Sequence, residues 1–344
     1  MKILVTANLV PFMHGGATYH VAGVVRALQQ AGHAVELLRL PFRFSPENDI
    51  LRAMAHAASL DLLQPNGVSI DQVIGLQFPG YGIAHPDHRV WVMHQHRAVY
   101  ELFNAAQATP ALTELRERVM AFDNAALTRA RAVFANSQRV AARLRDFNRI
   151  TATPLYHPPA HAQMFRCDTA WPYVFFPSRL ETLKRQHLVI DAARRMRSPL
   201  KIVLAGDGGQ RGVLAELIER HDVGDRVALI GHISEVEKRA FYARAAAVVF
   251  PAFDEDYGYV TLEAMLSSKP VVTCTDSGGP LEFVRNGDTG WIEPPDADVL
   301  AARLDWIAEH PRQAADAGAN GREAYLRADI SWDHVVDALT QPLN

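Results

Sequence analysis

The sequence predicts an α/β protein built from two doubly wound domains. Short apolar runs alternate with stretches of helical periodicity along the whole chain. The apolar runs lack strict period-two alternation, which is typical of parallel strands that are buried on both faces. The length of 344 residues suits two domains of about 150 residues each. We therefore expect a parallel sheet covered by helices on both faces in each half of the chain.

The expected strands and helices follow one another in regular order. In the first half, the strands are expected at residues 3–7, 34–40, 72–76, 90–93 and 132–135, with a helix at 17–30. In the second half, the strands are expected at 172–176, 201–205, 226–230, 246–250, 270–273 and 290–292. The helices of this half are expected at 184–196, 211–221, 236–244, 297–309 and 312–326.

A linker is predicted where the two halves meet. Residues 156–166 contain two prolines and show no clear periodicity, and a strand pattern restarts at Tyr173. The predicted domains are thus residues 1–160 and 161–330. Residues 331–344 form a C-terminal helix, with Ser331 as its N-cap, that is able to pack back toward the N-terminal domain.

The composition is that of a soluble globular protein, with 49% hydrophobic and 21% charged residues. The two cysteines, Cys167 and Cys274, do not make a disulfide framework, which favours a reducing compartment such as the cytoplasm. The apolar N-terminal run is too short for a signal peptide, and no apolar run approaches the ~18 residues needed to span a bilayer.

The net charge of −3 is distributed unevenly. Residues 1–165 carry 15 Lys and Arg against 11 Asp and Glu, whereas residues 166–344 carry 20 against 27. A basic first half could face an anionic acceptor or make peripheral contact with an anionic membrane surface. Scattered surface charge is the simpler explanation, because no tight cluster of Lys and Arg occurs.

Two glutamates mark the most informative stretch of the chain. Glu255 and Glu263 stand eight positions apart, with Gly258 between them at the start of a helical pattern. The unpaired N–H groups and the dipole at a helix N-terminus favour anions. Carboxylates beside such a helix end suit a diphosphate that carries hydroxyl-rich groups on either side. A nucleotide-sugar is a ligand of this kind.

Two basic residues follow the strand expected at 172–176. Arg179 offers a fork for phosphate oxygens and Lys184 offers a point charge, so that together they could neutralise a diphosphate. An exposed loop that happens to contain two basic residues is the ordinary alternative. The acidic triplet 254–256 could instead help to bind Mg²⁺ or Mn²⁺ with substrate phosphates, although no Cys/His cluster has zinc spacing.

Further candidates lie at the carboxyl ends of other strands, where ligands bind in open α/β sheets. Gly15 and Gly16 open a helix after the first strand, and a flexible turn is the alternative. His94 follows the strand at 90–93 and could hydrogen-bond a sugar hydroxyl, although a structural histidine is the commoner case. The backbone near Ile230 could grip a base ring. The turn at 206–208 is expected to be structural.

In combination, these residues resemble the retaining glycosyltransferases of family 4. That family has the GT-B fold, in which two Rossmann-like doubly wound domains enclose an interdomain cleft. The resemblance covers nearly the whole chain and is strongest over residues 173–293. Its motifs are Glu-x7-Glu from Glu255 to Glu263, Arg-x4-Lys at Arg179 and Lys184, the Gly-Gly loop at Gly15 and Gly16, the N-domain histidine His94, and Gly-Gly-x-x-Glu at 278–282.

The resemblance implies a role for each matching residue. Glu263 would hold the ribose hydroxyls, and Glu255 would face hydroxyls of the donor sugar. Arg179 and Lys184 would stabilise charge on the departing nucleoside diphosphate, and Gly16 would close over it. The backbone N–H groups of Gly258, Tyr259 and Val260 would meet the diphosphate. Residues 161–330 would then bind the donor and residues 1–160 the acceptor.

This chain departs from the family at three positions. Ser178 and Arg185 stand where the family often has glycine, on either side of the basic pair, and they could reshape the phosphate end of the site. Ser268 stands where a helix-ending glycine is usual, and we expect it to affect helix termination alone.

The expected function is metal-independent, retaining transfer of a sugar from a nucleoside-diphosphate sugar, preferably a UDP-sugar, to a hydroxyl of a glycan, lipid-linked or small-molecule acceptor. Neither a cofactor nor a nucleic-acid partner is expected. A nucleotide-sugar epimerase of similar fold and a catalytically silent nucleotide-sugar-binding protein are the alternatives. A nicotinamide dehydrogenase is disfavoured because the Gly-x-Gly-x-x-Gly fingerprint after the first strand is missing.

Overall fold

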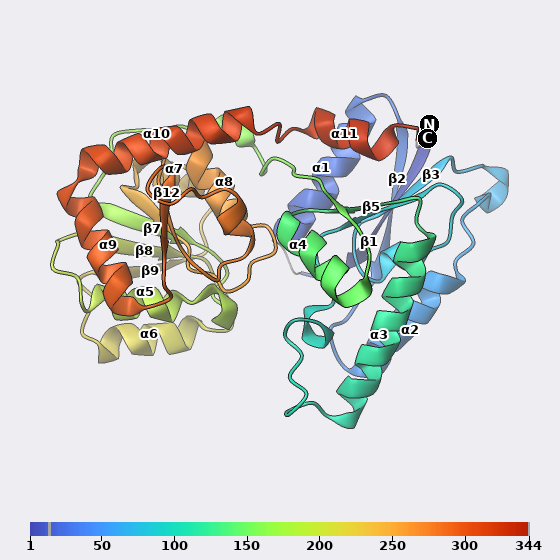
Figure 1. The fold of residues 1–344 in the computed structure, drawn as a ribbon, viewed down its shortest axis with the longest axis horizontal. Helices are drawn as coiled ribbons and strands as arrows, with labels where there is room; N and C mark the ends of the chain where they lie inside the picture. The colour runs from blue at the N-terminus through green and yellow to red at the C-terminus, as the bar shows by residue number, and fades with distance from the viewer. Residues whose placement is uncertain (13–14, 343–344) are drawn as a thin grey trace. The chain divides into compact units, whose positions relative to one another are not determined.

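The computed structural model describes residues 1–12 and 15–342, and it divides into two compact units (Figure 1). Unit 1 comprises Met1–His157 together with Ser331–Asn344, and unit 2 is Pro158–Ile330. The division at 157/158 lies inside the linker expected at 156–166. Residues 13 and 14, which directly precede the expected loop at Gly15 and Gly16, lie outside the described residues.

Unit 1 contains a parallel sheet with the strand order β2-β1-β3-β4-β5-β6. Its strands are β1 (Lys2–Leu9), β2 (Ala34–Pro41), β3 (Gln72–Gly75), β4 (His88–Val92), β5 (Ala132–Ala135) and β6 (Thr153–Pro154). Each strand expected in the first half is present. Strand β6 was not expected, because two residues are too few to produce a pattern.

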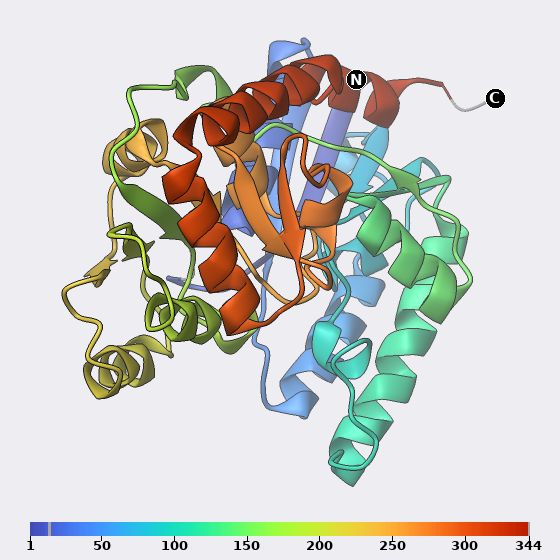
Figure 2. The same cartoon turned by 60° about the vertical axis from the view of Figure 1, so that its left-hand side comes forward.

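Helices cover both faces of this sheet because successive strand side chains point to opposite sides. Val90 and Val92 share one apolar cluster with Ile50 and Leu115, whereas Trp91 belongs to a second cluster with Val24. Figures 1 and 2 both show α3 lying along α2. The helices are α1 (Gly16–Gln30), α2 (Glu47–Ser59), α3 (Pro110–Arg129), α4 (Gln138–Arg143) and α11 (Trp332–Thr340).

Helix α11 completes the core of unit 1. Val335 and Leu339 are fully buried in the same cluster as residues of α1. Gly23 of α1 makes this packing possible, because a Cβ atom at that position would lie 2.2 Å from the ring of Trp332. Ser331 caps the helix by accepting a hydrogen bond from the backbone N–H of His334 at 3.1 Å.

Helix α1 contains a buried histidine. His20 is fully buried, with its ring 4.2 Å from that of Trp91 and 4.5 Å from that of His157. Neither ring nitrogen of His20 has a hydrogen-bond partner among the described residues. Burial therefore lowers the pKa of His20 to about 3, and the folded protein holds this imidazole neutral.

Because the folded protein keeps the His20 imidazole neutral, we expect the protein to lose stability in acid. As the pH falls through about 6.5, the unfolded chain protonates the imidazole of His20 and the folded chain does not, so unfolding takes up a proton. Below that pH, stability falls by up to about 1.4 kcal/mol per pH unit for each such group. We expect the His20→Phe variant to lose about 2 kcal/mol less than the wild type between pH 6.5 and 5.0.

Chemical denaturation at a series of pH values measures this difference. Comparison with the variant cancels the contribution of Asp123, which is present in both proteins and works in the opposite direction. Burial raises the pKa of Asp123 to about 7, so its protonation in the folded state stabilises unit 1 as the pH falls. Parallel pH profiles of the wild type and the variant would contradict the prediction.

Unit 2 contains a second parallel sheet, with the order β12-β11-β10-β7-β8-β9. Its strands are β7 (Tyr173–Pro177), β8 (Lys201–Ala205), β9 (Val227–Gly231), β10 (Ala247–Val249), β11 (Val271–Cys274) and β12 (Gly290–Glu293). Numbered from β7 as the first strand, this is the Rossmann order 3-2-1-4-5-6. All strands expected in the second half are present.

Strand β7 shows how the two faces of this sheet are filled. Val174 and Phe176 point into the main apolar cluster, and Phe175 between them stacks on Phe241 of α7 at 5.3 Å. Helices α5 and α6 lie next to one another below the strands β7, β8 and β9 in Figure 1. The helices are α5 (Gln186–Ala193), α6 (Arg211–Arg220), α7 (Glu235–Arg244), α8 (Tyr259–Leu266), α9 (Ala297–Glu309) and α10 (Pro311–Arg327).

The order of the strands places two loops side by side in unit 2. Strands β7 and β10 are neighbours, and the connections from them run in opposite directions across the sheet. Ligands bind at such a switch point, outside the carboxyl ends of the two strands. The loop after β7 carries Arg179 and Lys184, and the loop after β10 carries Glu255. The topology alone thus brings these candidates to one edge of the sheet.

Candidate active site

Lys184 and Glu255 meet at this edge. The ammonium of Lys184 forms an ion pair with the carboxylate of Glu255, and both side chains are largely shielded from solvent. The Lys184 Nζ atom also lies 5.5 Å from the centre of the Phe250 ring, at the end of β10. The structure thus joins one of the two basic residues to one of the two glutamates.

Arg179 lies in the same loop with an exposed side chain. Its guanidinium forms no hydrogen bond or ion pair with any residue that the structure describes, whereas its carbonyl accepts a hydrogen bond from the Gln186 side chain at 2.8 Å. The backbone of Gly206 packs closely against this loop, because a Cβ atom at that position would lie 2.0 Å from the carbonyl oxygen of Ser178. The backbone is fixed and the Arg179 side chain remains available to a ligand.

The helix expected at 184–196 begins later than the periodicity suggested. Thr182–Lys184 form a 3₁₀ turn, and Arg185 then adopts a left-handed conformation with φ of 58° before α5 starts. This interruption separates Lys184 from the helix and places it on the loop. A non-glycine residue in this conformation costs roughly 1–2 kcal/mol, so the geometry requires compensating contacts.

Those contacts come from Asp276 and Phe253. The Arg185 guanidinium donates two parallel hydrogen bonds to the Asp276 carboxylate, both 2.8 Å long. The same guanidinium lies 4.9 Å from the centre of the Phe253 ring. A bidentate Arg–carboxylate pair is the strongest form of such a contact and fixes direction as well as distance.

Helix α8 directs its N-terminus at the end of the Glu255 loop. Gly258 caps this helix with φ of 84°, a conformation that side chains disfavour, and a Cβ atom there would lie 2.9 Å from Pro280. The helix begins at Tyr259, followed by Val260, as the sequence suggested. At the other end, Ser268 has φ of 53° and replaces the usual glycine in ending the helix.

Glu263 lies one turn into α8 and is only 6% exposed. Its carboxylate accepts hydrogen bonds from Lys238 and from the Tyr242 hydroxyl, each 2.8 Å long. Lys238 also pairs with Glu235 at 3.0 Å. Burial disfavours the ammonium, but Glu263 and Glu235 outweigh that effect and raise the pKa of Lys238. Burial and the charge of Glu263 likewise raise the pKa of Tyr242 well above its usual value.

Ile230 stands near the end of β9 and is partly exposed. The adjacent Gly231 has φ of 74°, and its carbonyl accepts a hydrogen bond from the N–H of Gly206 at 2.7 Å. The ends of β8 and β9 are thus tied together at the same edge of the sheet.

The remaining candidates belong to unit 1. Gly15 is the N-cap of α1, and its carbonyl accepts from the N–H of Thr18 at 2.9 Å, so Gly16 opens the helix. His94 follows β4, and its Nδ1 atom lies 2.8 Å from the carbonyl oxygen of Gln95. Both groups stand at carboxyl ends of strands in the unit 1 sheet.

The structure adds four residues to the site that the sequence did not indicate. Lys238 and Tyr242 bond Glu263, and Arg185 and Asp276 form an ion pair. Lys238 and Tyr242 are spaced i, i+4 on α7, so they share one face of that helix. That spacing was visible, but nothing in the sequence showed that this face meets α8. The departure at Arg185 from the family glycine was visible as well, whereas its partner lies 91 positions away.

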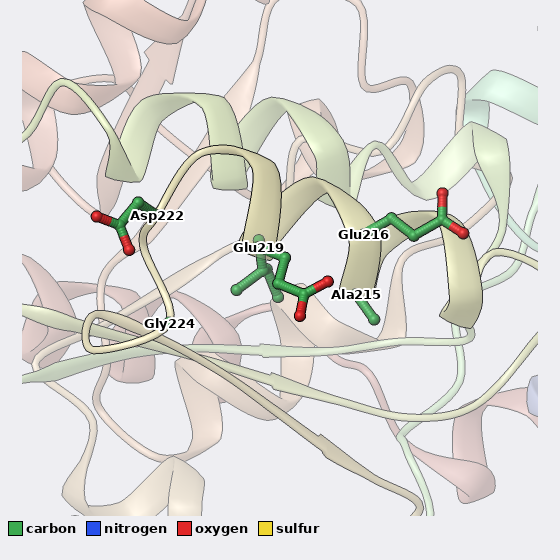
Figure 3. A pocket seen from close by; sticks show the side chains of 6 residues that line it. Ala215, Glu216, Glu219, Asp222 and Gly224 are labelled. Carbon is green, nitrogen blue, oxygen red and sulfur yellow. The ribbon is translucent and has the colours of Figure 1, made fainter.

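Among residues 1–12 and 15–342, no group of three or more His, Cys, Asp and Glu side chains is arranged to hold a metal ion. A surface hollow of about 400 Å³ beside α6 is lined by Glu216, Glu219 and Asp222. Figure 3 shows Glu216 and Asp222 at opposite ends of this hollow, so the carboxylates do not converge. The hollow is separate from the loops that carry the candidate residues.

In the described part of the chain, no helix combines the length and the apolar character that crossing a membrane requires.

The sequence of this chain is similar to that of known proteins. Residues 165–324 match the family model of glycosyl transferases group 1. The glycogen synthase of Mycobacterium tuberculosis is 33% identical over 172 residues, which are 49% of this chain and 41% of that protein. The D-inositol 3-phosphate glycosyltransferase of Mycolicibacterium smegmatis is 27% identical over 180 residues, which are 51% and 41% of the two chains. This chain therefore spans about two fifths of the length of these relatives.

Solved structures match nearly the whole chain. The sucrose-phosphate synthase from Thermosynechococcus elongatus has a TM-score of 0.79 at 20% identity, covering 99% of this chain and 97% of that one. HepE of Anabaena, solved in complex with UDP, has a TM-score of 0.73 at 19% identity, covering 99% and 98%. The chain therefore has the GT-B fold of these solved structures, and residues 165–324 in its second unit carry the sequence match to glycosyl transferases group 1.

Proposed function

We propose that the protein is a glycosyltransferase that moves a sugar from a nucleoside-diphosphate sugar to an acceptor hydroxyl. The observation that carries this proposal is the meeting of Lys184 and Glu255 at the switch point of unit 2, beside the N-terminus of α8. A cation and a carboxylate at a helix N-terminus fit a ligand with a diphosphate between two polyhydroxylated groups. Unit 2 then binds the donor, and unit 1 binds the acceptor.

In this proposal the residues act on different parts of the donor. Glu263 accepts hydrogen bonds from the ribose, and Lys238 and Tyr242 hold its carboxylate in place. The N–H groups of Gly258, Tyr259 and Val260 face the diphosphate, whereas Glu255 binds hydroxyls of the transferred sugar.

Arg179 and Lys184 stabilise the negative charge that grows on the diphosphate as the glycosidic bond breaks. Such contacts strengthen in the transition state and raise kcat. For unit 1, the resemblance to family 4 implies that His94 hydrogen-bonds a sugar hydroxyl and that Gly16 contacts the departing diphosphate.

The proposal also covers the finer features of the reaction. Transfer retains the anomeric configuration by attack on the same face and needs no metal ion, as the resemblance to family 4 implies. The donor nucleotide is UDP, which is the nucleotide bound by HepE of Anabaena. The acceptor is a glycan, a lipid-linked molecule or a small molecule, and peripheral membrane contact is part of the lipid-linked case.

A thermal-shift screen tests the donor site. Ligands that bind the native state raise its apparent stability, by about 2.7 kcal/mol when present at 100 times their Kd. We expect UDP and its sugars to raise the unfolding temperature more than GDP, ADP and their sugars do, and the Glu263→Gln variant to respond less. No shift with any of these ligands would contradict the assignment.

Product analysis then separates transfer from isomerisation. Incubation without acceptor should leave the sugar configuration of the donor unchanged, and an isomerised donor would favour an epimerase. With acceptor present, the anomeric proton coupling in the product reports whether the configuration is retained.

A further inference from the structure

Two residues with left-handed backbones flank the proposed donor contacts. Arg185, with φ of 58°, directly follows Lys184, and Asp254, with φ of 47°, directly precedes Glu255. Side chains disfavour this conformation, and it persists where the surroundings over-determine it, often at ligand sites. The contacts that enforce it therefore indicate what this part of the chain is built to hold.

The first set of contacts joins the Lys184 loop to the Glu255 loop. The N–H of Phe253 donates to the carbonyl of Leu183 at 2.7 Å, and the Phe253 ring lies under the Arg185 guanidinium at 4.9 Å. Main chain and side chain thus tie the residues next to Lys184 to the residues next to Glu255.

A third loop, residues 275–279, closes the arrangement. The N–H of Asp254 donates to the carbonyl of Asp276, and the N–H of Glu255 donates to that of Ser277, both at 2.9 Å. Gly278 makes this approach possible, because a Cβ atom there would lie 2.6 Å from the carbonyl oxygen of Glu255. Asp276 therefore contacts both residues with left-handed backbones. Its carbonyl accepts from Asp254, and its carboxylate accepts from Arg185.

We propose that Arg185 and Asp276 form a brace that positions Lys184 against Glu255 in the donor site; this inference rests on the proposed function. Arg185 and Asp276 are positioning residues, because they act through their neighbours. Asp276 is one-third exposed, so solvent screens the pair and its effect on global stability is small. Its geometric effect is larger, because displacements of about 1 Å in an active site can cost about 100-fold in rate.

A double-mutant cycle tests the brace. Arg185→Gly removes the guanidinium and relieves the left-handed backbone, Asp276→Asn removes the charge, and Arg185→Lys keeps the charge without the fork. We expect Arg185→Gly and Asp276→Asn each to lower kcat about 10- to 100-fold, with a smaller change in KM and little change in unfolding temperature. The double variant should lose no more than the worse single variant. Unchanged kcat in the single variants, or losses that multiply in the double variant, would overturn the proposal.

Amide hydrogen exchange provides a readout that does not require turnover. In Arg185→Gly and Asp276→Asn, the N–H groups of Glu255 and Gly279 should exchange faster than in the wild type. The matched control is Arg303→Ala, which removes another Arg–carboxylate pair beside tryptophan rings in unit 2, with Glu293 at 2.6 Å, and should leave these amides unchanged. Unaltered exchange in the brace variants would overturn the brace, whereas a wild type without nucleotide binding would contradict only the proposed function.

Discussion

Replacement of Lys184 with alanine is expected to lower the rate of sugar transfer by about 10²–10³-fold. The ammonium lies at the switch point of unit 2, where it pairs with Glu255. A charge that stabilises a departing diphosphate acts mainly in the transition state, so the loss should appear in kcat more than in KM. Initial rates measured with the nucleotide-sugar identified by the thermal-shift screen give both parameters.

A second lysine of the same unit supplies the control for this prediction. The Lys201 ammonium donates to the carbonyl of Asp225 at 2.6 Å, at the amino end of β8 and away from the switch point. Lys201→Ala should therefore transfer sugar at the wild-type rate. A Lys184→Ala variant that matches the Lys201→Ala variant in kcat would remove Lys184 from the mechanism.

The Gly206→Ala substitution is expected to destabilise unit 2 by about 3 kcal/mol or more. Gly206 has φ of 138°, outside the range that alanine accepts readily, and its Cβ atom would lie 2.0 Å from the carbonyl oxygen of Ser178. Main-chain atoms form the clash, so no side-chain rotation relieves it. The variant should also lose turnover, because Ser178 directly precedes Arg179.

Thermal unfolding measures this loss, which corresponds to a shift of roughly 6–12 °C for a unit of this size. The matched control is Gly209→Ala in the same turn, where a Cβ atom would have no neighbour within 4 Å. Gly209→Ala should unfold close to the wild-type temperature. Equal unfolding temperatures for the two variants would show that the close approach of Gly206 to Ser178 is not needed.

The strands of both sheets could be predicted from the sequence, because strands that are buried on both faces consist of continuous apolar runs. Lys184 and Glu255 were predictable as candidates because each follows a strand. Their contact was not visible in their spacing, since it depends on β7 and β10 being neighbours in the sheet.

The contacts of Glu263 could not be predicted from the sequence either. Its hydrogen bonds to Lys238 and Tyr242 depend on which face of α7 meets α8, and no local pattern encodes a contact between two helices that are separated by a strand and a loop. Arg185 was recognisable as a departure from the family glycine. Its left-handed backbone and its pairing with Asp276 required three loops to be placed in space.

The assignment of α11 to unit 1 has a consequence for synthesis on the ribosome. The chain completes all of unit 2 before it makes residues 331–340, which fill the core of unit 1 against α1. At typical elongation rates, residues 158–330 take on the order of ten to thirty seconds to translate. During that time the nascent unit 1 leaves the apolar face beneath α11 open to solvent and to chaperones. Unit 2, although encoded later than most of unit 1, is the first to have its whole core available.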